Sequence, residues 1–168
     1  DTCDKNFRFK FGGRVFWDAT IWNADSEIET AIGDDLRNGT EFRAARLYLS
    51  GEIYEYVVFK AEYDFANDAG TDFKDVYIGL QNVVVDGSKI LLGNTKAPMG
   101  LEQLTSSRFI TFMERGLNSA FFPDRNVGVM AMNNALDKRM LWQVAVFRDT
   151  DDFGDAFAND SNYNVAAR

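Results

Sequence analysis

The chain has 168 residues, of which 26 are acidic and 18 basic, giving a formal net charge of −8, and none is histidine. An acidic chain argues against a nucleic-acid-binding protein, because neutralising backbone phosphates needs a basic surface. The absence of histidine, of a nucleophile elbow and of metal-ligand spacing argues against an enzyme and against a bound cofactor or metal.

Residues 7–22, FRFKFGGRVFWDATIW, predict a long strand, because apolar and polar side chains alternate along them. One face is apolar and aromatic, and the other carries the cations Arg8, Lys10 and Arg14. Such a strand is longer than the strands of soluble proteins, which usually have about five or six residues. Cys3, just before it, is the only cysteine, so it has no intrachain disulfide partner and we expect a free thiol.

After an acidic loop that follows Trp22, six further segments alternate in the same way. The first two, within 42–68, reverse at a tight turn near Tyr54 and Glu55. In segment 72–82, strict alternation places Lys74 on the apolar face. The remaining strands are predicted at 89–98, 127–134 and 139–149, and residues 165–168 begin an eighth.

Segment 99–126 breaks the alternation, and part of it, Phe109 to Arg115, is predicted as a short helix. The connections between strands alternate in length, as do the short periplasmic turns and long external loops of outer-membrane barrels. The short ones lie at Tyr54–Glu55, 83–88 and 134–138, and the long ones follow Trp22, Phe65, Pro98 and Asp149.

Alternating strands are typical both of outer-membrane barrels and of soluble sandwiches or ligand-binding barrels. Three features favour the membrane: the long first strand, the aromatic residues near strand ends on the apolar face, and the mixed charges opposite them. The chain has no run of about 18 apolar residues that would predict a transmembrane helix, but barrel strands escape that test. We therefore predict an all-β fold, an antiparallel transmembrane β-barrel.

Several blocks of the sequence resemble the phosphate-selective porin O and P family. GTEFRAARLYLSGEIYEYVVFKAEYDFA is similar to that family's second and third strands, and DFKDVYIGL to its fourth. The most specific similarity is GLEQLTSSRFITFMERGLNSAFFPDRNVGV, which resembles the stretch that enters the pore as the third loop and then begins the next strand. The resemblance extends from Phe7 to Arg168.

This resemblance implies an outer-membrane barrel of about sixteen strands, usually a homotrimer, with a pore-folded third loop. Seven or eight strands correspond to the N-terminal part of such a barrel, so we expect residues 1–168 to be one β-barrel domain, an incomplete portion of a longer porin. The alternative is a complete barrel of eight strands. The expected function is a water-filled channel in the bacterial outer membrane for passive diffusion of small ions, with phosphate or other anions as solutes. Its expected surroundings are outer-membrane lipid.

Anion selectivity needs cations along the lumen. The side of the strands that would face the lumen nominates Arg8, Lys10, Arg14, Arg46 and Lys60. Arginine suits phosphate because its planar guanidinium binds two oxygens. In the alternative interpretation these cations only balance the acids of the same wet face, Asp18, Glu52, Glu62, Asp64 and Asp75.

The unpatterned segment supplies a second set of charges: Arg108, Glu114, Arg115 and Arg125. The resemblance implies that this segment narrows the pore and that anion-binding cations lie near it. The serines before Arg108 add hydroxyl donors for an oxyanion. For Glu114 we favour a salt bridge with Arg108 or Arg115 that holds the loop to the wall, because an inward carboxylate opposes anion passage.

The sequence departs from the family where paired arginines often enter the second strand, because FRAAR separates Arg43 from Arg46 by two alanines. With the acidic total charge, this departure leaves a general or weakly selective porin as an alternative. Two further alternatives are a structural outer-membrane barrel that anchors partners and a soluble β-barrel that binds a small ligand.

Overall fold

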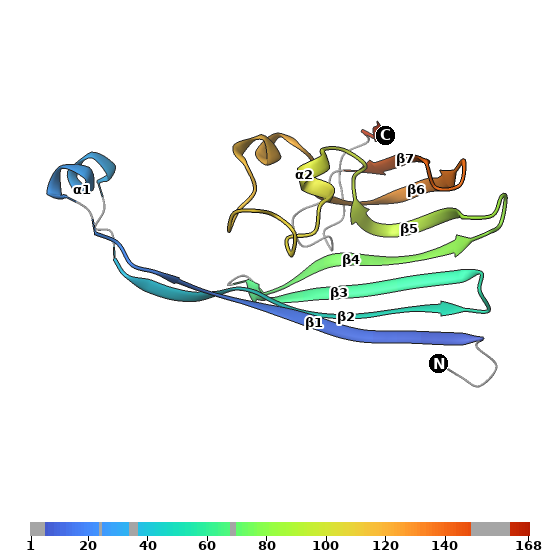
Figure 1. Ribbon diagram of the computed structural model, residues 1–168, viewed down its shortest axis with the longest axis horizontal. Helices are drawn as coiled ribbons and strands as arrows, with labels where there is room; N and C mark the ends of the chain where they lie inside the picture. The colour runs from blue at the N-terminus through green and yellow to red at the C-terminus, as the bar shows by residue number, and fades with distance from the viewer. Residues whose placement is uncertain (1–5, 24, 34–36, 68–69, 149–161) are drawn as a thin grey trace.

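In the computed structural model, residues 6–23, 25–33, 37–67, 70–148 and 162–168 are described, and Cys3 lies outside them. Eight antiparallel strands form one sheet in which each strand pairs with its neighbours in sequence (Figure 1). The seven strands and the beginning of an eighth that the alternation predicted are confirmed. The strands are β1 (Phe7–Thr20), β2 (Gly39–Ile53), β3 (Val57–Asn67), β4 (Gly70–Gln81), β5 (Ser88–Lys96), β6 (Arg125–Ala135), β7 (Met140–Arg148) and β8 (Asn164–Ala167).

Short helical segments occur only in the connections of the described chain. They are α1 (Ser26–Ile32), α2 (Leu101–Leu104) and the 3₁₀ turn η1 (Leu117–Phe121). None of the described helices is long and apolar enough to cross a membrane. The helix predicted at Phe109 to Arg115 is wrong, since that range forms bends and irregular chain. Just before this range, the backbone N–H of Arg108 donates to the Ser106 hydroxyl. Such a local bond between a side chain and the backbone competes with helix formation.

The connections have unequal lengths at the two ends of the sheet. Short turns join β2 to β3, β4 to β5 and β6 to β7, and the tight turn predicted at Tyr54 and Glu55 is confirmed by their left-handed φ angles of 49° and 63°. At the opposite end, 18 residues separate β1 from β2 and 28 separate β5 from β6, as the bounds of the strands show. The long connection predicted after Phe65 is wrong, because both strands continue until Asn67 pairs with Gly70.

Two bulges change which side chains share a face. In the β1–β2 pair, Phe16 lies opposite Ala44 and Trp17 opposite Phe42, so Arg43 is an extra residue on β2. In the β3–β4 pair, Glu62 alone lies opposite the two residues Lys74 and Asp75. A bulge of this kind interrupts the period of two along its strand. The placement of Lys74 on the apolar face is therefore wrong, and its ammonium lies 2.8 Å from the carboxylate of Asp72.

One face of the sheet, here called the apolar face, carries large exposed hydrophobic side chains on every strand. Phe11 of β1 is 72% exposed, and Ile78 of β4, Leu92 of β5 and Val146 of β7 are exposed as well. Trp17 and Phe42 face each other on the β1–β2 hairpin, which extends beyond the rest of the sheet and has α1 at its tip (Figure 1). Exposed apolar surface of this extent marks a site of contact with a membrane or with another protein.

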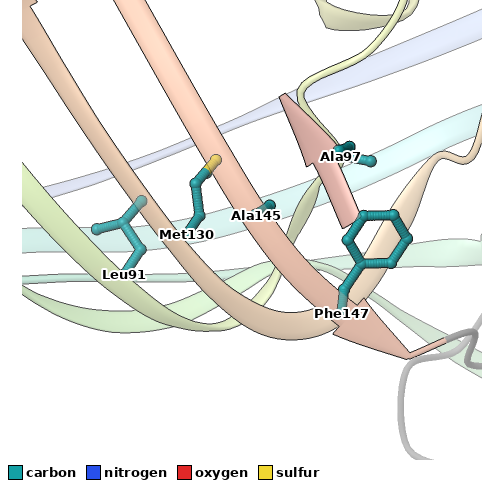
Figure 2. Close-up of a cluster of buried hydrophobic side chains, with 6 residues drawn as sticks. Leu91, Ala97, Met130, Ala145 and Phe147 are labelled. Atoms are coloured by element: carbon teal, nitrogen blue, oxygen red, sulfur yellow. The ribbon is translucent and has the colours of Figure 1, made fainter. Parts of the chain in front are cut away.

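The opposite face, here called the cavity face, has an apolar half on β5 to β8. Leu91, Met130, Ala145 and Ala166 lie side by side across the four strands and are buried, as Figure 2 shows for the first three. Phe147 and Ala97, the first residue after β5, complete this cluster. The connection between β5 and β6 begins in this cluster, since its first residue Ala97 is a member and the next residue, Pro98, is fully buried.

A glycine makes room for the largest member of this cluster. Gly128 lies opposite Phe147, and a Cβ atom there would lie 2.7 Å from the Cα of Phe147 and 2.2 Å from the carbonyl oxygen of Val146. Only glycine fits this close approach of two strands. The position of Phe147 therefore requires that Gly128 on the neighbouring strand has no side chain.

Candidate functional site

The other half of the cavity face encloses a cavity of about 620 Å³ together with the segment 97–124. Its lining includes nine basic and four acidic side chains of the described residues. The basic residues are Lys10, Arg14, Arg43, Arg46, Lys60, Lys96, Arg108, Arg115 and Arg125, and the acidic ones are Glu62, Asp75, Glu114 and Asp124. Half of the chain's 18 basic residues thus meet in this cavity with four of its 26 acidic residues, although the whole chain is negative.

Most of the nominated cations lie in this cavity. Lys10, Arg14, Arg46 and Lys60 reach it from the first three strands, and Arg108 and Arg115 reach it from the segment between β5 and β6. Arg8 lies outside it, in a neighbouring cavity of about 530 Å³ that also contacts Lys10. The guanidinium of Arg8 is 3.4 Å from Glu52 on the adjacent strand.

A first group of the cations is neutralised by carboxylates across the strands. Glu62 lies at the centre, with Lys60 at 2.6 Å, Arg14 at 3.2 Å and Arg46 at 3.9 Å. These distances support the interpretation that Arg14, Arg46 and Lys60 balance acids of the same face. The group thus forms a wall of alternating charge in which each cation already has an anionic neighbour.

The wall continues from Lys60 toward β6. Asp75 accepts from Lys60 at 2.5 Å and from Arg125 at 2.8 Å. Asp64 accepts from Arg46 at 2.6 Å and also from the backbone N–H of Ala45. The carboxylates of this wall are therefore held by two or more donors, and they are positioned by the pairing of the strands.

A second group of cations lines the cavity without a carboxylate partner in the described part of the chain. Lys96 donates to the carbonyl of Gln103, and Arg108 to that of Gly13 at 3.2 Å. Arg115 donates to the carbonyls of Glu102 and Thr105 at 3.0 and 2.8 Å. Lys10 forms no ion pair with any described residue. A carbonyl satisfies a donor without cancelling its charge, so these four side chains carry most of the uncompensated positive charge of the cavity.

The segment 97–124 crosses the cavity face and contacts β1 and β2 by hydrogen bonds. Arg14 donates to the Ser107 hydroxyl at 3.1 Å, and Arg43 donates to the carbonyl of Met113 at 2.9 Å. The carboxylate of Glu114 lies 3.2 Å from Arg43. Arg43 therefore takes the place that we predicted for Arg108 or Arg115 as the partner of Glu114.

Two cavity cations, Arg43 and Lys96, were not nominated from the sequence, and each was missed for a local reason. Arg43 and Arg46 have opposite parity in a regular strand, and the bulge on β2 brings both into the cavity. Lys96 is the last residue of β5 and lies opposite Arg125 of β6. It is next to the segment without alternation, so the sequence does not assign its side chain to a face. The odd spacing between Arg43 and Arg46 was the sequence signal for the bulge. A reading by strict alternation assigns the two residues to opposite faces and so misses it.

Two aromatic residues of the cavity, Phe16 and Tyr48, lie against cations. The guanidinium carbon of Arg43 lies 5.0 Å from the centre of the Phe16 ring, and that of Arg14 lies 5.8 Å from it. Lys60 lies 5.8 Å from the ring centre of Tyr48. These cation–π contacts add to the ion pairs in fixing the cations of the wall.

The chain was compared with protein families and with curated proteins. A family model described as phosphate-selective porin O and P matches residues 9–167, nearly the whole chain. No curated protein matches the sequence at a significant level.

Proposed function

The chain belongs to the phosphate-selective porin O and P family, and on this premise we propose that it forms an anion-preferring, water-filled channel for passive diffusion of small solutes, phosphate among them. Family membership indicates an outer-membrane porin rather than an enzyme. A pore selects ions by the charges and the width of its lumen, without bond chemistry.

The apolar face supports contact with outer-membrane lipid. Its exposed side chains run across the sheet from Phe11 to Val165, and tilted strands with an outward apolar band are typical of outer-membrane barrels. Lipid cannot satisfy unpaired backbone groups, so a sheet in the membrane must close. We propose that β1 to β8 are the N-terminal part of a closed barrel of about sixteen strands that assembles as a homotrimer.

The charge of the cavity is the observation that carries the proposed selectivity. Nine basic and four acidic side chains line it, whereas the chain as a whole has eight more acids than bases. The surplus acids lie elsewhere, so the net charge of the chain does not set the potential along the proposed ion path. Rings of arginine and lysine favour anions in pores.

The segment between β5 and β6 supports a constriction at the same place. It crosses the cavity face to Arg14 and Arg43 and brings Arg108 and Arg115 with it. We propose that this segment is the pore-folded loop and that the cations without carboxylate partners, Lys10, Lys96, Arg108 and Arg115, form the anion path. Arg8 would serve at the neighbouring entrance.

The test is the zero-current potential of the unboiled native porin in a planar bilayer across a potassium chloride gradient. We expect the sign that corresponds to chloride passing more easily than potassium. The opposite sign would refute the anion preference while leaving the channel intact. Absence of channel steps from folded protein would refute the porin function itself.

A further inference from the structure

A tight turn in the segment between β5 and β6 is held on β1 at two consecutive residues. The backbone N–H of Phe109 donates to the carbonyl of Ser106 at 2.9 Å, which closes the turn. Ser107 accepts from Arg14 of β1 at 3.1 Å, and Arg108 donates to the carbonyl of Gly13 of β1 at 3.2 Å. The turn is thus attached to the sheet just before Phe109, which keeps the backbone of that residue in place.

Phe109 places an uncovered aromatic ring in a cationic cavity. The side chain lines the cavity and yet the residue is 80% exposed. Phe112, three residues later, is also 80% exposed but does not line the cavity. An inorganic anion gains no hydrophobic contact from an apolar ring beside its path. A solute with an apolar part would cover the ring and release the water that hydrates the ring.

The same turn offers donors for an oxyanion. The Ser107 hydroxyl accepts from Arg14, so its own proton is free to be donated. Arg108 uses one N–H group on the Gly13 carbonyl, and a guanidinium has five. Hydrogen-bond donors for a phosphate group and an aromatic face for an organic group therefore occur on neighbouring residues of one pinned turn.

We propose that this turn, residues 106–109, is a subsite for organic phosphate monoesters with a flat apolar group, such as aryl phosphates. The phosphate would meet Ser107 and Arg108, and the ring would pack on Phe109. This inference rests on the proposed anion channel and adds amphipathic organic phosphates to the inorganic anions among its solutes.

The experiment compares phenyl phosphate with methyl phosphate as blockers of single-channel chloride current through the full-length native porin. The two probes carry the same phosphate group and differ in the ring. We expect phenyl phosphate to block with a residence time longer by about fivefold, the effect of one favourable aromatic contact. Phe109→Ala should bring the two residence times close together, and Phe109→Leu, which keeps apolar bulk, should retain part of the difference.

Phe112→Ala is the matched control, because it removes an equally exposed ring of the same segment outside the cavity. Equal residence times for the two probes in the native porin would overturn the inference, as would equal effects of Phe109→Ala and Phe112→Ala. The potassium chloride gradient separates this result from failure of the channel proposal. A channel that prefers chloride but does not distinguish the two esters refutes the subsite alone.

Discussion

The two halves of the cavity face follow the same strand geometry and have opposite chemistry. On β1 to β4 charged side chains line the cavity, with Glu62 among three cations, whereas on β5 to β8 an apolar row contains Leu91, Met130 and Ala145. The segment 97–124 is anchored on both halves. Apolar packing holds its base at Ala97, and hydrogen bonds to β1 and β2 hold its middle.

The difference shows how segment 97–124 can be firmly attached to the sheet and still present a polar, hydrated surface. Packing of apolar side chains is not weakened by ions, so it suits the end of the segment that needs no contact with solute. Charged contacts on the other half hold the segment while keeping a polar surface. The two halves should therefore respond differently to substitution, and three predictions test this.

The largest effect is expected in the apolar half, from Phe147→Ala. Removing a buried ring that no neighbouring side chain can replace should lower the free energy of unfolding by about 3 kcal/mol. Urea unfolding in lipid vesicles, followed by tryptophan fluorescence, measures it. Phe112→Ala removes an exposed ring and should change stability by less than about 0.5 kcal/mol. Similar losses in both variants would show that the apolar cluster does not anchor the segment.

A smaller effect on stability is expected in the charged half, from Asp75→Asn. The change leaves Lys60 and Arg125 without their shared carboxylate and should cost about 1–2 kcal/mol, less than a dry buried pair because this face is wet. It should also shift the zero-current potential further toward chloride. Both quantities are measured on the same preparation.

Asp124→Asn is the matched control for this variant. It removes the same charge from the same cavity, but its side chain is 52% exposed and it pairs with Arg125 at 3.2 Å. We expect a shift of the potential in the same direction with little loss of stability, since exposed ion pairs contribute little. If Asp75→Asn is no less stable than Asp124→Asn, the charged wall contributes nothing measurable to the fold.

The smallest effect on stability is expected from Lys10→Gln, since Lys10 is exposed and has no ion pair with a described residue. The substitution should leave unfolding unchanged and lower the preference for chloride in the potassium chloride gradient, because it removes an uncompensated charge from the cavity. Lys138→Gln removes the same charge at the turn between β6 and β7, outside the cavity. An equal change in both variants would mean that total charge, and not the cavity, sets the selectivity.

Alternation along the chain determined most of the fold. It located the seven full strands and the start of the eighth, because a period of two is read directly from residues such as Phe9, Lys10 and Phe11. It also separated the apolar face from the charged one on β1. The resemblance to the porin family was likewise carried by the sequence alone, and the family match to residues 9–167 confirms it.

Departures from alternation were decided by tertiary structure. The bulges at Arg43 and at Lys74–Asp75 arise from how neighbouring strands pair, and one added residue reverses the face of everything beyond it. The path of segment 97–124 depends on contacts with β1, about 95 residues away in sequence, such as that between Arg108 and Gly13. A one-dimensional pattern contains no record of such contacts.

The sequence by itself therefore determined the strands, the two faces and the types of charge available to a pore. Only the tertiary structure decided where those charges meet. Composition counts every acid of a chain with a net charge of −8, whereas folding gathers nine cations and four carboxylates around one cavity. The physical reason is that an ion responds to the charges near its path, and charges beyond a Debye length of about 8–10 Å are screened.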